Sequence, residues 1–442
     1  MNVATRYLET LGTTSLRVRC GRLLACNGTV LEAHGPEAAL GELCEIRDGS
    51  AVEPITAQIV GFRDERVVLM PLARMHQVSM GAQIRALDRR MDVPVGDGLL
   101  GRVVDAFGGP IDGRGAVHCT GRVPLHREPI NPLQRGEINE VMETGVRSID
   151  SFLTIGRGQR VGIFAGSGIG KSTLLGMLTA HARADVIVVA LIGERGREVG
   201  DFITHTLKAE GLARSVVIAA TADQSPLARV HAVHAAHAAA EYFRDCGKHV
   251  LLILDSMTRF AMAQREIGIA AGEPPTARGY PPSVFTQLPR FLERCGNVRG
   301  SGSISAIYSI LVEGDDMNEP VADHMRAILD GHIVLSRDLA DQGQFPAVDV
   351  LRSISRLMPR LATRVEGDLA RDTRALLAAH ERARDLISMG AYQPGHDAVL
   401  DKAVKMLPEL KEFLQQTPDE RMSRSDAMAW LGRIVRVEGL RA

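Results

Sequence analysis

The chain has 442 residues, of which 45% are hydrophobic and 24% charged, values that are ordinary for globular proteins and argue against wholesale disorder. Its 52 Lys and Arg residues nearly balance 53 Asp and Glu residues, so no overall basic field draws the protein to nucleic acid or anionic lipid. This length exceeds one compact core, and we expect about two or three domains.

The cysteine pattern and the apolar runs indicate the compartment. The six cysteines are scattered without a C-x-x-C pair, which favours reduced thiols in a cytosolic protein over a disulfide or zinc framework. The N-terminus lacks the basic and apolar segments of a secretory signal. The longest apolar runs, such as Val186–Ile192, have the length of strands. We therefore expect a soluble protein whose membrane association, if it has one, is peripheral.

The first part of the chain shows short alternating patterns from about Leu16 to Asp88. Apolar residues alternate with arginines over Leu16–Cys20, and Asn27 with Gly28 is a hairpin-turn signal. Several such strands within about 70 residues predict a small β-barrel. A short helix is expected ahead of it, whose apolar face packs on the barrel or, alternatively, serves as a docking surface. That face consists of Val3, Tyr7, Leu8 and Leu11.

Beyond the barrel the pattern changes twice. Met91–Glu128 is rich in Gly and Pro and marks an extended connection. From Ile130 to about Leu357, continuous apolar strands alternate with helix-like stretches, the form of a parallel sheet covered by helices on both faces. After residue 360 the pattern is helical, over Asp368–Met389 and again over 397–416. We predict an α/β core with an N-terminal β-barrel and a C-terminal α-helical domain, divided as 1–88, 89–360 and 361–442.

A phosphate-binding loop is predicted between the strand Val161–Ala165 and the helix Lys171–Ala184. Three glycines let the backbone turn tightly and aim its N–H groups at phosphate oxygens, assisted by the helix N-terminus. Lys171 supplies a positive charge at the β- and γ-phosphates, and the Ser172 hydroxyl is placed to bind Mg²⁺. The usual first glycine of the motif is Ala165 here. The predicted nucleotide contacts are Gly166, Ser167, Gly168, Ile169, Gly170, Lys171, Ser172 and Thr173.

Two carboxylates follow core strands of the same predicted sheet. Asp255 ends the strand His249–Asp255, where it can hold the hydration shell of Mg²⁺, although many such residues only cap a helix. Glu194 follows Val186–Ile192 and can orient the water that attacks the γ-phosphate. A solvated charged loop is the alternative for Glu194. Because both strands end at the crevice where ligands bind, we favour the functional interpretation.

Three histidines, His231, His234 and His237, are spaced three residues apart on a predicted helix. They could be taken for a metal site, but they spread over about a third of the helix circumference and no fourth ligand is near. The surrounding stretch is rich in alanine. We therefore expect surface or interface histidines rather than metal ligands.

These residues carry a family resemblance that covers essentially the whole chain. The segments that resemble catalytic subunits of rotary ATP synthases are Gly193–Glu198, Glu241–Asp245, Leu251–Asp255 and Asp349–Arg356. The segments that resemble the flagellar and type III protein-export ATPases in particular are Phe164–Leu175, Arg259–Glu266, Gly279–Val284, Val312–Asp316, Ile328–Arg337, Gly390–Tyr392 and Leu400–Ala403. The acidic run of the rotary subunits' C-terminal helices is missing, which favours the export branch.

The resemblance implies a RecA-like sheet, an ATPase that uses ATP and Mg²⁺, and roles for individual residues. Glu194 matches the family's catalytic carboxylate, and Arg195 and Arg259 match arginines that line its phosphate pocket. Phe345 matches an aromatic that stacks on adenine. Arg356 matches an arginine finger given by the adjacent subunit, which implies a homo-hexamer whose active sites are completed across interfaces.

The resemblance also implies the setting in which the chain works. It implies ATP hydrolysis that energises protein export, including chaperone–cargo release and unfolding, by a cytoplasmic ring held peripherally at the inner membrane. The expected partners are a stator-like regulator at the N-terminus, a central stalk protein, export gate membrane proteins and chaperone–cargo complexes, with no nucleic acid. A flagellum and a virulence-type apparatus stay open alternatives, of which we favour the flagellum.

Two other classes of function remain as alternatives. A nucleic-acid translocase predicts exposed aromatics on the N-terminal barrel, whereas residues 1–88 hold only Tyr7 and Phe62. A regulatory subunit that binds nucleotide without hydrolysing it predicts loss of Glu194 or Lys171, and both are present.

Overall fold

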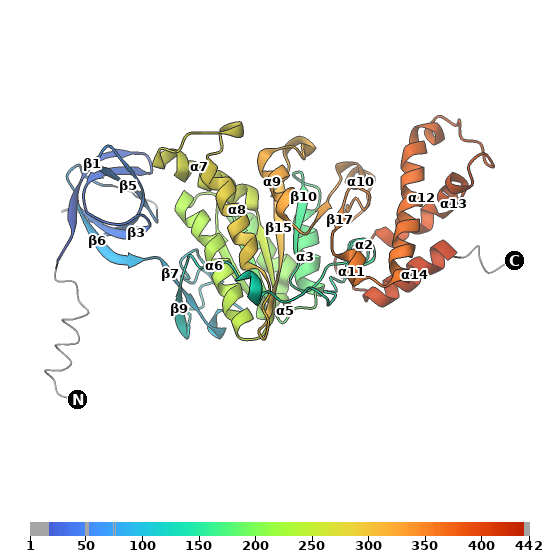
Figure 1. Cartoon of the computed structure of the whole chain (residues 1–442), viewed down its shortest axis with the longest axis horizontal. Helices are drawn as coiled ribbons and strands as arrows, with labels where there is room; N and C mark the ends of the chain where they lie inside the picture. The colour runs from blue at the N-terminus through green and yellow to red at the C-terminus, as the bar shows by residue number, and fades with distance from the viewer. Residues whose placement is uncertain (1–16, 49–52, 74, 76, 437–442) are drawn as a thin grey trace.

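The computed structural model describes residues 17–48, 53–73, 75 and 77–436, and its parts follow one another along the long axis (Figure 1). The β-barrel lies at one end, the α/β sheet in the middle and the last helices at the other end. The predicted fold class is therefore confirmed. The boundaries at residues 88 and 360 stay predictions, and the expected helix with Val3, Tyr7, Leu8 and Leu11 lies outside the described residues.

The N-terminal domain is a closed barrel of antiparallel strands in the order β1-β2-β5-β4-β3-β6. Inward-facing apolar side chains, such as Leu31, Ile46 and Ile84, are at most 1% exposed and fill its interior. Closure pairs every strand on both sides, so the barrel has no free edge. The strands are β1 (Cys20–Asn27), β2 (Val30–His34), β3 (Glu42–Arg47), β4 (Ile55–Arg63), β5 (Arg66–Pro71) and β6 (Gln83–Arg90).

The barrel is seated on helix α7 (Met257–Ala271) of the central domain. A Cβ added to Gly61 in β4 would lie 3.1–3.3 Å from atoms of Ala271, so a side chain here would require the barrel and α7 to shift apart by a few tenths of an ångström. Beside it, Nη2 of Arg63 donates to the carbonyl of Ala270 at 3.2 Å. The chain enters the central domain through a two-stranded ribbon of β7 (Asp92–Val95) and β9 (Gly121–Pro124).

The central sheet runs in the order β17-β16-β10-β15-β13-β11-β12-β8, with β14 paired to β15. Its strands are parallel except β14 and β17. The strands are β8 (Val103–Val104), β10 (Arg160–Ala165), β11 (Val186–Ile192), β12 (Ser215–Ala220), β13 (His249–Asp255), β14 (Gly296–Asn297), β15 (Ser303–Leu311), β16 (Gly331–Val334) and β17 (Ile354–Ser355).

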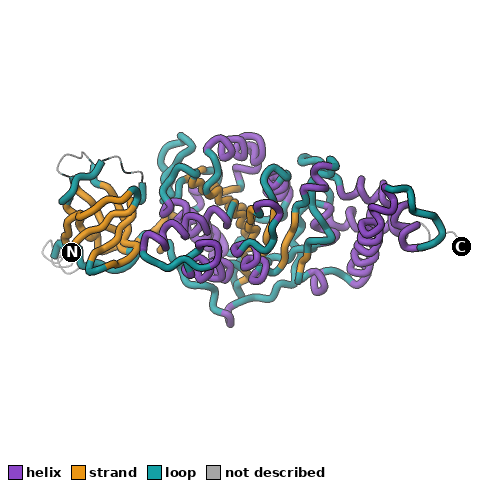
Figure 2. The backbone as a smooth tube through the Cα atoms, turned by 90° about the horizontal axis from the view of Figure 1, so that it is seen from above, coloured by secondary structure: helices purple, strands orange, loops and turns teal. Residues whose placement is uncertain are grey.

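Helices cover both faces of this sheet, which Figure 2 shows from above. One face packs against α6 (Pro226–Asp245), α7, α8 (Pro282–Arg294) and α9 (Pro320–Ile328). The other packs against α2 (Arg147–Phe152), α3 (Lys171–His181), α4 (Gly196–Asp201), a π-helix (Phe202–Leu207) and α5 (Lys208–Ala213). The short helices α10 (Arg337–Asp341) and α11 (Met358–Leu361) lead into the C-terminal domain.

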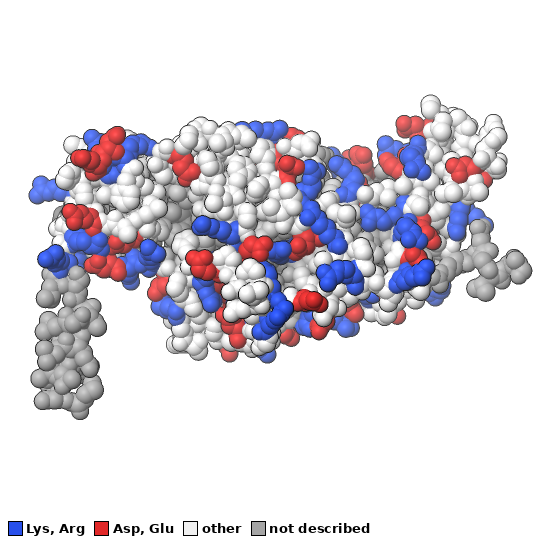
Figure 3. All heavy atoms as spheres, viewed as in Figure 1, with Lys and Arg blue, Asp and Glu red and all other residues white. Residues whose placement is uncertain are grey.

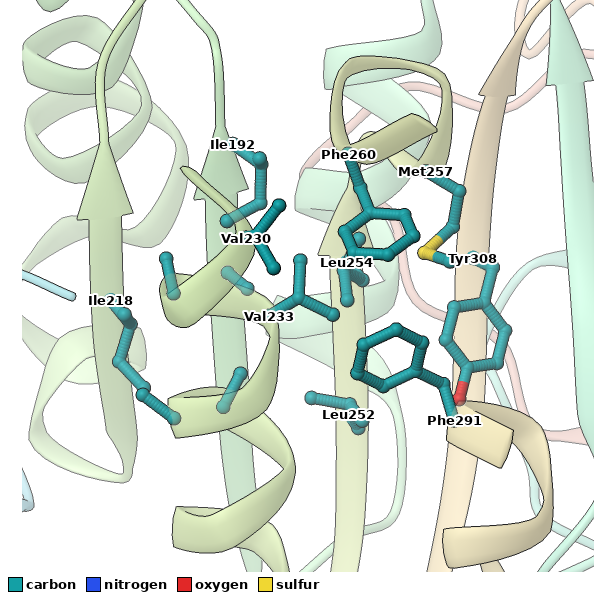
Figure 4. Close-up of a cluster of buried hydrophobic side chains, with 14 of the residues drawn as sticks. Ile192, Ile218, Val230, Val233, Leu252, Leu254, Met257, Phe260, Phe291 and Tyr308 are labelled. Atoms are coloured by element: carbon teal, nitrogen blue, oxygen red, sulfur yellow. The ribbon is translucent and has the colours of Figure 1, made fainter. Parts of the chain in front are cut away.

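The two-sided burial explains the continuous apolar run of β11. Ile192 lies on the face where α6 contributes Val230 and Val233, and Figure 4 shows these side chains packed together. Val189 belongs to the cluster on the opposite face. Because alternate residues of a strand point to opposite faces, a strand covered on both sides must be apolar throughout.

The C-terminal domain consists of α12 (Arg364–Ser388), α13 (Ala398–Leu414) and α14 (Arg424–Arg436). α12 begins with a capping box between Thr363 and Glu366, and Asp397 caps α13. None of the described helices combines the length and the apolar character that crossing a bilayer requires. On the face shown in Figure 3, acidic and basic side chains are interspersed.

The expectation that His231, His234 and His237 lie on the surface is wrong, because they are 2%, 8% and 0% exposed. One side of the alanine-rich helix α6 packs on the sheet. On its other side, His231 contacts the barrel and His234 contacts the connecting segment that carries His126. Nε2 of His231 donates to Oε1 of Gln58 in the barrel at 2.8 Å. The ring of His234 lies 4.1 Å from that of His126. Within the described ranges, no group of histidine, cysteine and carboxylate side chains is arranged to hold a metal.

Burial of these histidines makes stability depend on pH. Desolvation lowers the pKa of His237 from 6.5 to about 3, and that of His231 to about 3. The unfolded chain therefore binds protons that the folded chain excludes, so stability is full above pH 6.5 and is lost as the pH falls. Each group lowers the free energy of unfolding by up to about 1.4 kcal/mol for each pH unit below that point. We expect His237→Leu to flatten this decline in urea unfolding at pH 7, 6 and 5. The exposed control His396→Leu should leave it unchanged, and equal slopes in both variants would contradict the account.

Candidate active site

The predicted phosphate-binding loop has the expected strand–loop–helix form, from β10 to α3. Gly168 and Gly170 have φ of 78° and 88°, the left-handed conformation that favours glycine. α3 begins at Lys171, and no side chain caps its N-terminus. Its first N–H groups are therefore directed into the loop, where an anion can accept them. Ser167, Gly168, Ser172 and Thr173 are exposed on this loop.

Three charged side chains converge at the carboxyl ends of β10, β11 and β13. Nζ of Lys171 contacts Oδ1 of Asp255 and lies 3.6 Å from Oε1 of Glu194. The three side chains are only 11%, 6% and 16% exposed, respectively. The structure thus brings together the predicted lysine and both predicted carboxylates, with one positive charge between two negative charges.

Burial and the neighbouring charge of Asp255 raise the pKa of Glu194 from 4.5 to about 7, against the opposing charge of Lys171. Oε1 of Glu194 is buried and accepts no hydrogen bond from the residues that the structure describes. A carboxylate in this state can accept a proton near neutral pH.

Sequence reasoning missed Ser309, whose hydroxyl donates to Oδ1 of Asp255 at 2.6 Å. Ser309 lies on β15, which is hydrogen-bonded to β13, and it is fully buried. A lone serine in an apolar strand carries no motif. Only the order of strands in the sheet places it beside Asp255, so no local signal could have found it.

The donor set fits a divalent cation of the magnesium type. Mg²⁺ prefers oxygen ligands and keeps several of its waters. Ser172 offers an exposed hydroxyl in the first turn of α3, and Asp255 offers a carboxylate whose orientation is fixed by Ser309. Oε1 of Glu194 accepts no hydrogen bond within the described part of the chain and is therefore able to accept one from an ordered water.

The two predicted pocket arginines differ in placement. The stem of Arg259 packs on Gly193, where an added Cβ would lie 2.9–3.3 Å from it, so Arg259 is beside the loop that carries Glu194. The side chain of Arg195 is 85% exposed and lies 3.7 Å from Glu198. Arg195 is therefore not brought into the buried cluster in this structure.

Phe345 and Arg356 also lie in different places. The ring of Phe345 is 3.4–3.5 Å from the position of a Cβ on Gly170, so it borders the phosphate-binding loop. Arg356 follows β17 at the outer edge of the sheet, and its guanidinium bonds to the carbonyls of Ala327 and Arg326 at 3.3–3.5 Å. Among the contacts of the described residues, none joins Arg356 to Lys171. The chain thus does not bring its own Arg356 to its own site.

Three family matches cover most of the chain. Residues 24–88 match the ATP synthase alpha/beta family, beta-barrel domain, and residues 145–355 match the nucleotide-binding domain of the same family. Residues 362–433 match the T3SS EscN ATPase C-terminal domain.

Relatives and solved structures agree with these matches. The chain is 51% identical to the flagellum-specific ATP synthase of Salmonella typhimurium, over 94% of this chain and 93% of that protein. It is 46% identical to the type 3 secretion system ATPase of Xanthomonas euvesicatoria, over 95% and 96%. The assembled ATPase EscN from the enteropathogenic E. coli type III secretion system aligns with a TM-score of 0.89 at 40% identity, over 94% of this chain and all of that chain. EscN in complex with its central stalk EscO aligns with a TM-score of 0.86 over the same share of this chain.

The raised pKa of Glu194 predicts a stability effect of its own. A carboxyl whose folded pKa exceeds its unfolded value stabilises the fold at low pH, and that stability is lost as the pH rises through about 7. Glu194→Gln removes this loss. We expect the variant without nucleotide to melt above the wild type at pH 8.5 and to approach it at pH 5, in thermal unfolding. Glu412→Gln, on an exposed part of α13, is the control and should shift neither melting point. A lower melting point of Glu194→Gln at pH 8.5 would refute the assignment.

Proposed function

The chain belongs to the family of flagellum-specific ATP synthases and type III secretion ATPases, and on this premise we propose that it works as a ring whose active sites are completed across subunit interfaces. It is an ATPase that energises protein export, and ATP is its nucleotide. The separation of Arg356 from the cluster of Lys171, Glu194 and Asp255 is the observation that carries the ring proposal.

The charged cluster supports a mechanism for hydrolysis. The N–H groups of the loop and the ammonium of Lys171, once it leaves Asp255, bind the β- and γ-phosphates. Ser172 and Asp255 would hold Mg²⁺, which neutralises phosphate charge when it is bound. Glu194 accepts a proton from the water that attacks the γ-phosphorus, and the bond to the β-phosphate oxygen breaks to give ADP and phosphate.

Arginines supply the remaining positive charge in this proposal. Arg259 already stands beside Gly193, whereas Arg195 reaches the site only by leaving Glu198. Arg356 of the next subunit stabilises the charge on the transferring phosphoryl group, a contribution typically worth about 10³–10⁵ in rate. Phe345, at the border of the loop, stacks on the adenine.

The partners follow from the same proposal. We assign a homo-hexamer with a central stalk, for which the assembled EscN and its complex with EscO are the support. The tip between α12 and α13 exposes Leu386, Met389 and Val399 by 52%, 72% and 50%, which suits contact with a protein partner. A stator-like regulator at the N-terminus, export gate proteins, chaperone–cargo complexes and a peripheral place at the cytoplasmic side of the inner membrane complete the assignment. We favour a flagellar apparatus, because the relatives at 50–51% identity are flagellum-specific, whereas both kinds of ATPase occur at 44–47%.

A mixing experiment tests the shared active site. Glu194→Gln and Arg356→Ala should each be nearly inactive, and wild-type ATPase activity should rise with protein concentration as rings form. A 1:1 mixture of the two variants should recover about a quarter of the wild-type rate, because half times half of the interfaces pair an intact Glu194 with an intact Arg356.

The control is the double variant Glu194→Gln/Arg356→Ala, which should stay inactive with either single variant because neither mixture forms an intact interface. A concentration-independent wild-type rate, or no recovery in the 1:1 mixture despite ring formation, would mean that each chain works alone.

The magnesium assignment predicts a role for Ser309. Ser309→Ala frees the carboxylate of Asp255 to rotate, and we expect about a tenfold higher Mg²⁺ concentration for half-maximal ATPase activity. The matched control is Ser305→Ala, because Ser305 is equally buried on β15 but accepts from the N–H of Gly158 at 2.8 Å. ADP binding measured in EDTA should not change in either variant. The same Mg²⁺ requirement in both variants would remove Ser309 from the site.

A further inference from the structure

The segment Gln415–Glu420, the first part of the connection from α13 to α14, returns to the nucleotide-binding domain next to Phe345. The backbone N–H of Gln416 donates to the carbonyl of Phe345 at 2.8 Å. One residue of the central domain is thus held on two sides: its ring borders Gly170 of the phosphate-binding loop, and its carbonyl is bonded to the C-terminal domain.

Gln416 is fixed by its own side chain, which is buried with the residue only 4% exposed. Its Oε1 accepts from the backbone N–H of Arg147 at 2.8 Å. Its Nε2 donates to the carbonyls of Gly145 and Glu420, both at 2.8 Å. A buried amide with its donors and acceptor all bonded has a single orientation, and its loss leaves several polar groups unpaired.

Arg147 of α2 clamps the same segment at both ends. Its guanidinium donates to the carbonyl of Phe413 at 2.9 Å and bonds to the carbonyl of Gln415 and the carboxylate of Glu420. The guanidinium also lies 4.9 Å from the centre of the Trp430 ring. Because Arg147 is only 3% exposed, these contacts form in a low dielectric and hold the segment rigidly on the central domain.

Phe345 is 45% exposed, so only part of its surface is packed. The hydrogen bond from Gln416 to its carbonyl therefore adds a restraint on its position. A cavity of about 620 Å³ is lined by Thr173 of α3 and by Pro418 of the same C-terminal segment. The C-terminal segment and Thr173, the last residue of the phosphate-binding loop, therefore line the same cavity.

We propose that Gln416 is a positioning residue for base binding: it anchors the C-terminal segment that fixes Phe345, so that the helical domain sets the wall against which the adenine stacks. This rests on the assignment of Phe345 to the adenine. It separates the base side of the site, which depends on the C-terminal domain, from the phosphate side, which lies wholly within the central domain.

The test compares a ligand that has a base with one that has none. In the full-length protein, Gln416→Ala should weaken binding of ADP by about 5–10-fold, the loss of one or two hydrogen bonds, and leave binding of inorganic pyrophosphate within about twofold. Calorimetry gives both dissociation constants on one preparation. The ratio of the two dissociation constants does not depend on how much of the protein is folded, because unfolded molecules are missing from both titrations. Gln416→Glu keeps the acceptor for the N–H of Arg147 but turns an oxygen toward the carbonyls of Gly145 and Glu420, and it should change the ratio in the same direction.

Two further variants make the outcome decisive. Arg374→Ala breaks another contact between the domains, with the carbonyls of Ser353 and Phe152, and should leave the ratio unchanged. Phe345→Ala should weaken the binding of ADP and leave the binding of pyrophosphate unchanged. If Phe345→Ala leaves the ratio unchanged, the adenine assignment fails. The role of Gln416 is overturned if Phe345→Ala changes the ratio of the two dissociation constants and the Gln416 variants do not. It is also overturned if the Gln416 variants weaken the binding of ADP and of pyrophosphate equally.

Discussion

A single buried ammonium group, that of Lys171, holds Asp255 and Glu194 together at the carboxyl edge of the sheet. Two carboxylates at the ends of core strands repel each other in a low dielectric, and one positive charge compensates only one of them. Burial first, and the charge of Asp255 second, therefore raise the pKa of Glu194. When Lys171 binds a triphosphate instead, the carboxylates of Asp255 and Glu194 need other partners. Asp255 already has one, because it accepts a hydrogen bond from the hydroxyl of Ser309.

The sheet also explains why a second subunit suits this site. The cluster forms at β10, β11 and β13 in its interior, whereas Arg356 follows β17 at its outer edge. A contact between the site of one chain and the edge of the next would be heterologous, and heterologous contacts form a ring when the rotation between subunits closes. The closed barrels cannot join one another by adding strands, because closure leaves no unpaired edge.

What could be predicted from the sequence was local. The loop at Lys171 and the carboxylates Asp255 and Glu194 could be predicted because each sits at a strand end that its own apolar run defines. Ser309 and Gln416 could not, since their partners lie 54 and 71 residues away in sequence and only the folded sheet and domains bring them close. The histidines of α6 were misplaced for the same reason: an alanine-rich helix gives no sign that a barrel residue such as Gln58 will cover it.

The helix α7 has a mechanical consequence. It starts two residues after Asp255, carries Arg259 in its first turn and ends at Ala271 against Gly61 of the barrel. At about 1.5 Å per residue, its 15 residues make a strut roughly 22 Å long. A helix resists shortening, so the strut keeps the spacing between hydrolysis site and barrel constant. A displacement of Arg259 along the helix axis would therefore be transmitted to the barrel through Ala271.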